Sequence, residues 1–251
     1  MIVGMADQID YELRGDDFQA VLITLDSGES VRAEPGAMMW MEDGIEMDTS
    51  TGGGILSGIK RKFAGESFFI TSFTNNSNTR SVVGFAADYP GKILPVDLAR
   101  GSILCQRDAY LCSAHGIDVT MAFSKRLGAG FFGGEGFILQ KLTGHGLAFI
   151  HAGGHIIERD LAAGERLRVD TGCIVGFEES VDYNIEMVKG VKTMLFGGEG
   201  LFMATLRGPG KCWVQTTPFS RFANRVLSAA GGSVGQHKRG GGLLGQVLQG
   251  D

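Results

Sequence analysis

A Gly-Glu turn that recurs at a nearly constant interval is the feature that most limits how this chain can fold. It appears in "FAGESFFITSF" at Glu66, in "FGGEGFILQKL" at Glu135 and in "FGGEGLFMATL" at Glu199, so the intervals are 69 and 64 residues. A second signature, a glycine three residues after a leucine, recurs at Gly28, Gly101 and Gly164. Two interleaved signatures with nearly the same period indicate three copies of one structural unit.

Within each copy, apolar and polar residues alternate, which is typical of a β-strand with one buried face. The stretch "ERLRVDTG" (residues 165–172) shows this alternation clearly. Forty glycines against five prolines, spread between short apolar runs, indicate tight turns rather than a linker. Two of these turns, at residues 144–146 and 208–210, are predicted to be hairpin tips.

The sequence therefore predicts an all-β fold of three internally repeated antiparallel β units, of the double-stranded β-helix or β-sandwich type, around a pseudo-threefold axis. One triplicated domain is expected over residues 1–218, with interleaved units at roughly 8–63, 64–126 and 127–218. A proline precedes apolar residues at helical spacing, which predicts a short amphipathic helix over 219–230. The glycine-rich tail, 231–251, is expected to be flexible. The apolar helix positions are Phe219, Phe222, Val226 and Leu227.

The Gly-Glu turn, the "PGAMM" element (residues 35–39) and the triplicated layout resemble the altered-inheritance-of-mitochondria protein twenty-four family. The resemblance extends over roughly residues 8 to 220. It implies three double-stranded β-helix units similar to the tryptophan RNA-binding attenuation protein fold, with assembly into a trimer or another homo-oligomer. The family brings no established catalytic residues. Its mitochondrial members are associated with inner-membrane organisation, which applies to this chain by analogy alone.

The composition argues against several classes of protein. A formal net charge of −5 and a sequence pI near 5.6 are not typical of a nucleic-acid binder, which needs an excess of Lys and Arg. The four cysteines have neither the density of a disulfide scaffold nor a paired zinc-binding spacing. The start of the chain lacks the basic and then apolar order of a signal peptide, and no run approaches the ~20 apolar residues of a membrane span. We therefore expect a cytoplasmic protein.

Two stretches match the residue pattern of a catalytic motif, but neither lies in the structural setting that its motif requires. "GAGFFG" (128–133) fits the dinucleotide fingerprint, but the next stretch, 134–146, has strand composition and glycines at both ends, where the fingerprint needs a helix. "GGSVG" (231–235) fits the nucleophile elbow, but it lies in the glycine-rich tail, where nothing would hold a strained turn. The sequence nominates no catalytic residue and no cofactor, and it favours a protein that is not an enzyme.

The densest group of metal-binding residue types is "HGLAFIHAGGHIIERD", which contains His145, His151, His155 and Glu158. No two of these histidines are two residues apart, as a cupin-type metal site requires. A surface cross-strand pair of His151 and His155 is the preferred interpretation. A weak metal site made by these two histidines and Glu158 is the alternative.

Each Gly-Glu turn carries one carboxylate, and such a carboxylate commonly accepts hydrogen bonds from backbone N–H groups of its turn. We therefore interpret these residues as structural. The alternative is that the three acids converge near the axis and bind a cation or share protons. The turn residues are Gly65, Glu66, Gly134, Glu135, Gly198 and Glu199.

Just before each Gly-Glu turn the chain mixes cations with apolar residues. A threefold arrangement would gather these segments into a basic, apolar rim at one end of the protein. Such a rim suits anionic lipid head groups, an apolar partner surface or self-assembly. The alternative is that its apolar residues fill the ends of the core and its cations are simply solvated. The rim residues are Lys60, Arg61, Lys62, Phe63, Lys125, Arg126, Phe131, Phe132, Lys189, Lys192, Met194 and Phe196.

From these patterns we expect a scaffold or binding protein without enzymatic activity, which forms homo-oligomers and engages a membrane surface or a protein partner through the rim. The alternative is a double-stranded β-helix protein that binds a small molecule or a metal. Nucleic acid is not an expected partner.

Overall fold

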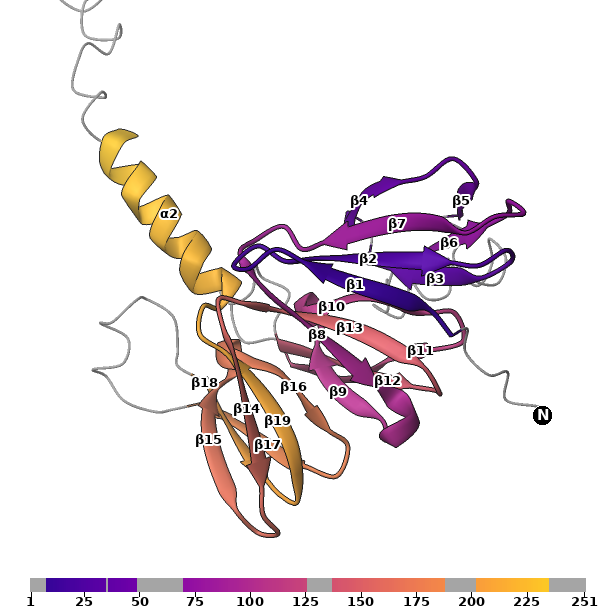
Figure 1. Ribbon diagram of the computed structural model, residues 1–251. Coiled ribbons are helices and arrows are strands. Elements are labelled where there is room, and N and C mark those ends of the chain that lie inside the picture. Colours follow the sequence, from indigo (N-terminus) through magenta and orange to yellow (C-terminus); the bar gives the residue numbers. More distant parts are fainter. Residues whose placement is uncertain (1–7, 35, 49–69, 126–136, 188–201, 235–251) are drawn as a thin grey trace, which may run out of the picture.

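The part of the chain that the structure describes folds into antiparallel β-sheets and one α-helix that projects from them (Figure 1). The structure is a computed structural model and describes residues 8–34, 36–48, 70–125, 137–187 and 202–234. Within these ranges every pairing between named strands is antiparallel, as alternating apolar and polar residues predict. The predicted all-β class is confirmed.

The strands of the described residues form four sheets. The first has the order β1 (Asp10–Arg14), β2 (Ala20–Leu25), β7 (Ser81–Ala86), β4 (Met38–Met41). The second has the order β5 (Ile45–Asp48), β6 (Thr71–Asn75), β3 (Ser30–Ala33), β10 (Tyr110–Ala114), β13 (Leu147–Gly153), β8 (Gly91–Asp97). The third has the order β11 (Asp118–Lys125), β12 (Phe137–Thr143), β9 (Ile103–Gln106), β16 (Ile174–Glu178), β19 (Gly210–Gln215), β14 (Ile156–Leu161). The fourth has the order β15 (Arg166–Asp170), β18 (Phe202–Arg207), β17 (Asp182–Met187).

One scheme of strand pairing recurs along the chain, in segment one (β2 to β7), segment two (β8 to β13) and segment three (β14 to β19). In each segment the first and third strands pair with the sixth, while the second and fourth strands pair with the fifth. These segments begin and end elsewhere than the units predicted at 8–63, 64–126 and 127–218, because the prediction divided the chain at the Gly-Glu turns. The pseudo-threefold axis itself stays a prediction.

The segments are joined by sheets that they share. Strand β3 of segment one pairs with β10 of segment two, and β9 of segment two pairs with β16 of segment three. We call these two pairings the seams. Each seam turns two three-stranded half-sheets into a six-stranded sheet. Segment two therefore contributes to two different sheets, and it cannot be separated from its neighbours without breaking main-chain hydrogen bonds.

The core lies between the sheets, in two clusters of buried apolar side chains. Strand β2 shows why the sequence places them there: Val21, Ile23 and Leu25 are fully buried, while the residues between them are half-buried. Burial of one face of each strand is the main stabilising term, at about 25 cal/mol for each Å² of apolar surface removed from water. The largest fully buried side chains are Phe73, Phe85, Phe137, Phe149 and Phe177.

One local prediction is wrong, and another is confirmed with a later end. The turns at 144–146 and 208–210 are not hairpin tips, because β12 and β13, like β18 and β19, lie in different sheets and do not pair with each other. The helix predicted over 219–230 is α2 (Phe219–Val234), which continues into the stretch predicted as tail. Among the described residues, no helix is long and apolar enough to cross a membrane.

Candidate functional site

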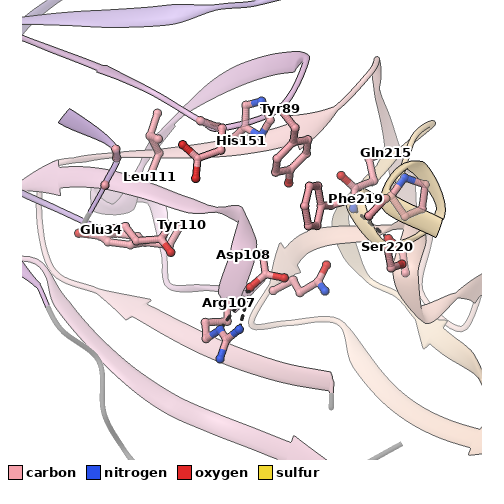
Figure 2. Close-up of a pocket in the computed structure, with 18 of the residues that line it drawn as sticks. Glu34, Tyr89, Arg107, Asp108, Tyr110, Leu111, His151, Gln215, Phe219 and Ser220 are labelled. Carbon is pink, nitrogen blue, oxygen red and sulfur yellow. Dashed lines mark hydrogen bonds and ion pairs between the residues drawn. The ribbon is translucent and has the colours of Figure 1, made fainter. Parts of the chain in front are cut away.

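A cavity of about 520 Å³ lies where the three segments and the start of α2 meet, and we call it the junction cavity (Figure 2). This volume lies within the usual range for a small-molecule site, roughly 300 to 1,000 Å³. Segment one contributes the residues after β3 and β7, segment two contributes β13 and a 3-10 turn at Arg107–Ala109, and segment three contributes the end of β19. Its lining includes Glu34, Asp88, Tyr89, Arg107, Asp108, Tyr110, His151, Gln215, Phe219 and Leu227.

The three segments contribute equivalent positions to this cavity. Ala20, Ile93 and Ile156 each lie eight residues before the repeated glycine of their segment, and each begins or nearly begins its first strand. Their partners across the sheet are Ala86, His151 and Gln215, and all three line the cavity. One backbone position therefore carries a methyl group, an imidazole and an amide in the three segments. Because these three side chains differ in polarity, the cavity wall combines apolar and polar surface.

Gln215 fixes the wall between segments two and three. Its Oε1 accepts a hydrogen bond from the Gly153 N–H at 2.7 Å, and its Nε2 donates one to the Gly172 carbonyl at 2.8 Å. Both ends of this buried amide are thus engaged, so its role is to position the strands around the cavity.

His151 is the most unusual group in the cavity wall. Its side chain is 2% exposed, and its Nδ1 has no hydrogen-bond partner among the described residues. The Tyr89 ring meets the imidazole edge to face, with 4.6 Å between centroids. Burial lowers the pKa of His151 to about 4, so the imidazole is neutral at physiological pH. A buried nitrogen without a partner can accept or donate a hydrogen bond when a ligand enters.

Acidic groups dominate the other side of the cavity. The Arg107 guanidinium donates hydrogen bonds to Asp108 Oδ1 from Nε at 3.2 Å and from Nη2 at 3.1 Å. Glu34 as a whole residue is exposed at the cavity, although neighbouring groups remove solvent from its carboxyl, and its backbone N–H donates to the Leu111 carbonyl at 3.0 Å. Loss of solvent around the carboxyl, and then repulsion from Asp108, raise the pKa of Glu34 to about 7. Glu34 therefore changes its charge near neutral pH.

Aromatic and helical residues close the third side. The Phe219 ring at the start of α2 lies 5.1 Å from that of Tyr89, so Tyr89 stands between His151 and Phe219 (Figure 2). Arg221 forms an ion pair with Asp170, which holds the first turn of α2 against segment three. Burial, together with the nearby Asp108 and Glu34, raises the pKa of Tyr89, so its hydroxyl stays protonated. The wall made by α2 is partly open to solvent, and it carries the apolar Phe219, Ala223 and Leu227 beside the polar Ser220 and Asn224.

The predicted histidine cluster is not one site. His151 lines the junction cavity, whereas Glu158 lines a different cavity, where its carboxylate accepts hydrogen bonds from Lys211 Nζ at 2.6 Å and from Trp213 Nε1 at 2.9 Å. The surface His151–His155 pair is wrong as well, since His151 is buried while His155 is exposed. Within the described residues, no group of three or more His, Cys, Asp or Glu side chains could hold a metal ion.

The six residues of the Gly-Glu turns lie outside the described residues. So do the rim residues, except Lys125, whose backbone ends β11. Their predicted roles stay predictions.

Sequence reasoning missed most of the junction cavity. Glu34, Tyr89, Asp108 and Phe219 lie far apart along the chain. Glu34 and Tyr89 stand in loops, Asp108 in a short 3-10 turn and Phe219 at the start of a helix. None belongs to a motif. The one available signal was His151, the single histidine inside an apolar strand run, "LAFIHAG".

Comparison with known proteins supports the fold. The family model described as Mitochondrial biogenesis AIM24 matches residues 11–217. A relative named Uncharacterized protein, from Streptococcus pyogenes serotype M6, is 26% identical over 221 residues, which are 85% of this chain and 87% of the relative. The crystal structure of a Streptococcus pyogenes protein aligns with a TM-score of 0.73 and 24% identity, covering 88% of this chain and 100% of that one. At this identity the likeness shows the fold alone.

Proposed function

This chain belongs to the Mitochondrial biogenesis AIM24 family, and from this premise we propose that it is a binding protein without enzymatic activity, whose ligand is a small molecule with a cationic amine and an apolar body. The observation that carries the proposal is the junction cavity, which combines acidic groups, aromatic faces and a buried imidazole nitrogen without a partner.

The charges of the lining favour a cation. Three carboxyl groups, Glu34, Asp88 and Asp108, face one guanidinium, that of Arg107. The Arg107 and Asp108 side chains form an ion pair with each other. The charge that remains comes from the carboxyl groups of Glu34 and Asp88, and it is negative. The faces of Tyr89 and Phe219 add attraction for an ammonium group, because an aromatic ring is electron-rich on its face.

The remaining surface suits an apolar body. Phe219, Ala223 and Leu227 of α2 form one wall, and Ala86, Ala87 and Leu111 form part of the opposite one. Phe219 is 47% exposed and Leu227 is 67% exposed, so a ligand lying between the walls would cover apolar surface that now faces water.

The first test of this proposal uses phenethylamine as the probe, with 3-phenylpropionate as its anionic counterpart. We expect isothermal titration calorimetry to detect binding of the amine and little binding of the acid. Because Glu34 has a raised pKa of about 7, its carboxyl is mostly neutral at pH 6 and mostly ionised at pH 8. The affinity for the amine, which stays protonated in this range, should therefore rise about tenfold between these pH values.

Replacing Glu34 with Gln should remove this rise and leave the affinity at its pH 6 value. The matched control is Glu12→Gln, an exposed carboxylate of β1 beside Arg14, which should behave as the parent protein does. Equal binding of the amine and the acid, or an unchanged pH dependence in Glu34→Gln, would contradict a cationic ligand in the junction cavity.

A scaffold role through the predicted rim belongs to the same proposal, since binding to a membrane surface or a protein partner is a further use of a binding protein. Its support is the sequence pattern alone. A variant with Lys60, Arg61, Lys125, Arg126, Lys189 and Lys192 replaced by Gln should lose co-sedimentation with vesicles rich in phosphatidylserine, because charge attraction would hold the rim there. Undiminished co-sedimentation would refute the electrostatic form of this role.

A further inference from the structure

Among the described residues, two strand edges lack a partner that the equivalent edges have in the neighbouring segments. The seams pair the second strand of one segment with the third strand of the next, as β3 with β10 and as β9 with β16. This leaves β15, the second strand of segment three, and β4, the third strand of segment one. Within the described ranges neither has a neighbour on its outer side. Figure 1 shows these two strands at opposite ends of the protein.

We propose that β15 of one copy pairs with β4 of a second copy, as a third seam formed between chains, so that the protein associates head to tail with itself. A contact of this kind joins two different surfaces, so it produces a closed ring or an open chain of copies. The inference does not depend on a ligand in the junction cavity.

The other unpaired edges hold different positions in the pairing scheme. Strands β5, β11 and β17 hold one position in the three segments, and among the described strands it is an edge in all three. Strands β8 and β14 are also edges, and their counterpart β2 is covered by β1. Strand β4 is a third strand and β15 is a second strand, and these are the two positions that the described chain uses to join its segments. The backbone geometry required for the contact is therefore already present at both edges.

The two seams fix the register of the proposed contact. In the first seam Cys112 pairs with Ala33, and in the second Gly176 pairs with Cys105. Cys112 and Gly176 each follow a β-bulge, and in β4 the residue after the bulge is Trp40. Ala33, Cys105 and Val169 hold equivalent positions, because each pairs with a residue that lies five positions after the glutamate of a Gly-Glu turn. These partners are Thr71, Gln140 and Ala204.

Pairing Trp40 with Val169 of the second copy sets the remaining pairs. Met41 then lies opposite Arg168, and Asp43, in the turn after β4, lies opposite Arg166. The two seams continue to the same position, where the His115 N–H donates to the Ser30 carbonyl at 3.1 Å and the Glu179 N–H donates to the Ser102 carbonyl at 3.0 Å. Asp43, Arg166 and Arg168 are all exposed. Opposite charges directly across two strands stabilise the pairing, and like charges destabilise it. The charges of the two edges thus match in this register.

The surface of β4 also favours a covered state. Met39 is 53% exposed, Trp40 is 40% exposed and Met41 is 38% exposed, so three consecutive large apolar residues meet solvent along one edge strand. Exposed edges of this kind are a ready template for pairing with another chain. A second copy that adds β15 would cover part of this surface and would satisfy the main-chain groups of both edges.

The test is the solution mass of the full chain, measured by light scattering over a range of concentrations. The parent protein should exceed the mass of one chain, 26.7 kDa. Two variants block one edge each: Met41→Lys with Asp43→Lys places cations opposite the arginines of β15, and Arg166→Glu with Arg168→Glu places anions opposite Asp43. Each blocked variant should have the mass of one chain, whereas Arg100→Glu, a control on an exposed 3-10 turn, should keep the parent mass.

Mixing the two blocked variants gives the sharpest result. In the mixture the intact β15 of one variant meets the intact β4 of the other, and the two altered edges carry opposite charges, so the mixture should recover a mass above that of one chain. A chain that carries all four changes has complementary charges again and should recover the parent mass. Thermal denaturation of each variant shows that it is folded. A parent protein with the mass of one chain at every concentration would overturn the proposal, and so would blocked variants that keep the parent mass.

Discussion

Replacing Gly91 with Ala is expected to lower the free energy of unfolding by about 3 kcal/mol, because the new methyl group has no room. A Cβ at this position would lie 1.9 Å from the Ala152 carbonyl oxygen and 2.5 Å from His151 Nε2. The first of these atoms belongs to the backbone of the neighbouring strand β13 and cannot rotate away.

The backbone of Gly91 cannot shift cheaply either. Its N–H donates to the Asp17 carbonyl at 2.7 Å, and its own carbonyl accepts a hydrogen bond from the Gln19 N–H at 3.3 Å. Movement of β8 away from β13 would stretch these bonds as well as the strand pairing. Equilibrium unfolding in urea measures the effect as a lower midpoint.

The matched control is Gly172→Ala. Its new Cβ would have its nearest neighbours at 3.3 Å, the Asp170 carboxylate, and at 3.5 Å, the Pro218 ring. We expect a change within about 1 kcal/mol there. If Gly91→Ala were no more harmful than Gly172→Ala, the close packing of β8 against β13 would be wrong.

Replacing Phe149 with Ala should lower the free energy of unfolding by about 3 to 5 kcal/mol. Phe149 is fully buried in β13, where it pairs with Cys112 on one side and Pro95 on the other. The Tyr11 and Phe149 rings pack edge to face with 4.9 Å between centroids, so the Phe149 side chain also connects β1 to the second sheet. Truncation would leave a cavity that these neighbours fill only in part.

Phe18 offers the comparison, since it is 74% exposed and its truncation should change stability by no more than about 0.5 kcal/mol. The urea midpoint should fall for Phe149→Ala with an unchanged slope, because the folded state remains the same. A loss below about 1 kcal/mol would show that Phe149 is not in a close-packed core.

The sequence predicts the class of this fold well and its connections poorly. Alternation such as that of Val21, Ile23 and Leu25 shows which face of a strand is buried, and this is enough for an all-β assignment. It does not show which strand lies alongside. The glycines at 144–146 look like a hairpin tip, yet β12 pairs with β9 and β11 while β13 pairs with β8 and β10. These partners are set by packing between segments.

The candidate site was harder to predict for a related reason. Tyr89, Asp108 and Phe219 meet only after three segments and a helix have packed together, and their spacing along the chain carries no trace of this. The sequence predicts His151 as half of a surface pair, but the structure buries it in the cavity wall. Alternation of apolar and polar residues does not distinguish a strand in the middle of a sheet from one at the surface. A buried polar residue in an apolar strand was the useful clue.

The seams also affect what happens while the ribosome is making the chain. When segment one has emerged, the outer edge of β3 stays open until β10 is made, and the edge of β9 then waits for β16. A nascent or truncated chain that stops between these points ends with an unprotected strand beside apolar side chains, which favours aggregation. Incomplete chains should therefore aggregate more readily than complete ones. We expect chaperones to bind them or proteases to degrade them.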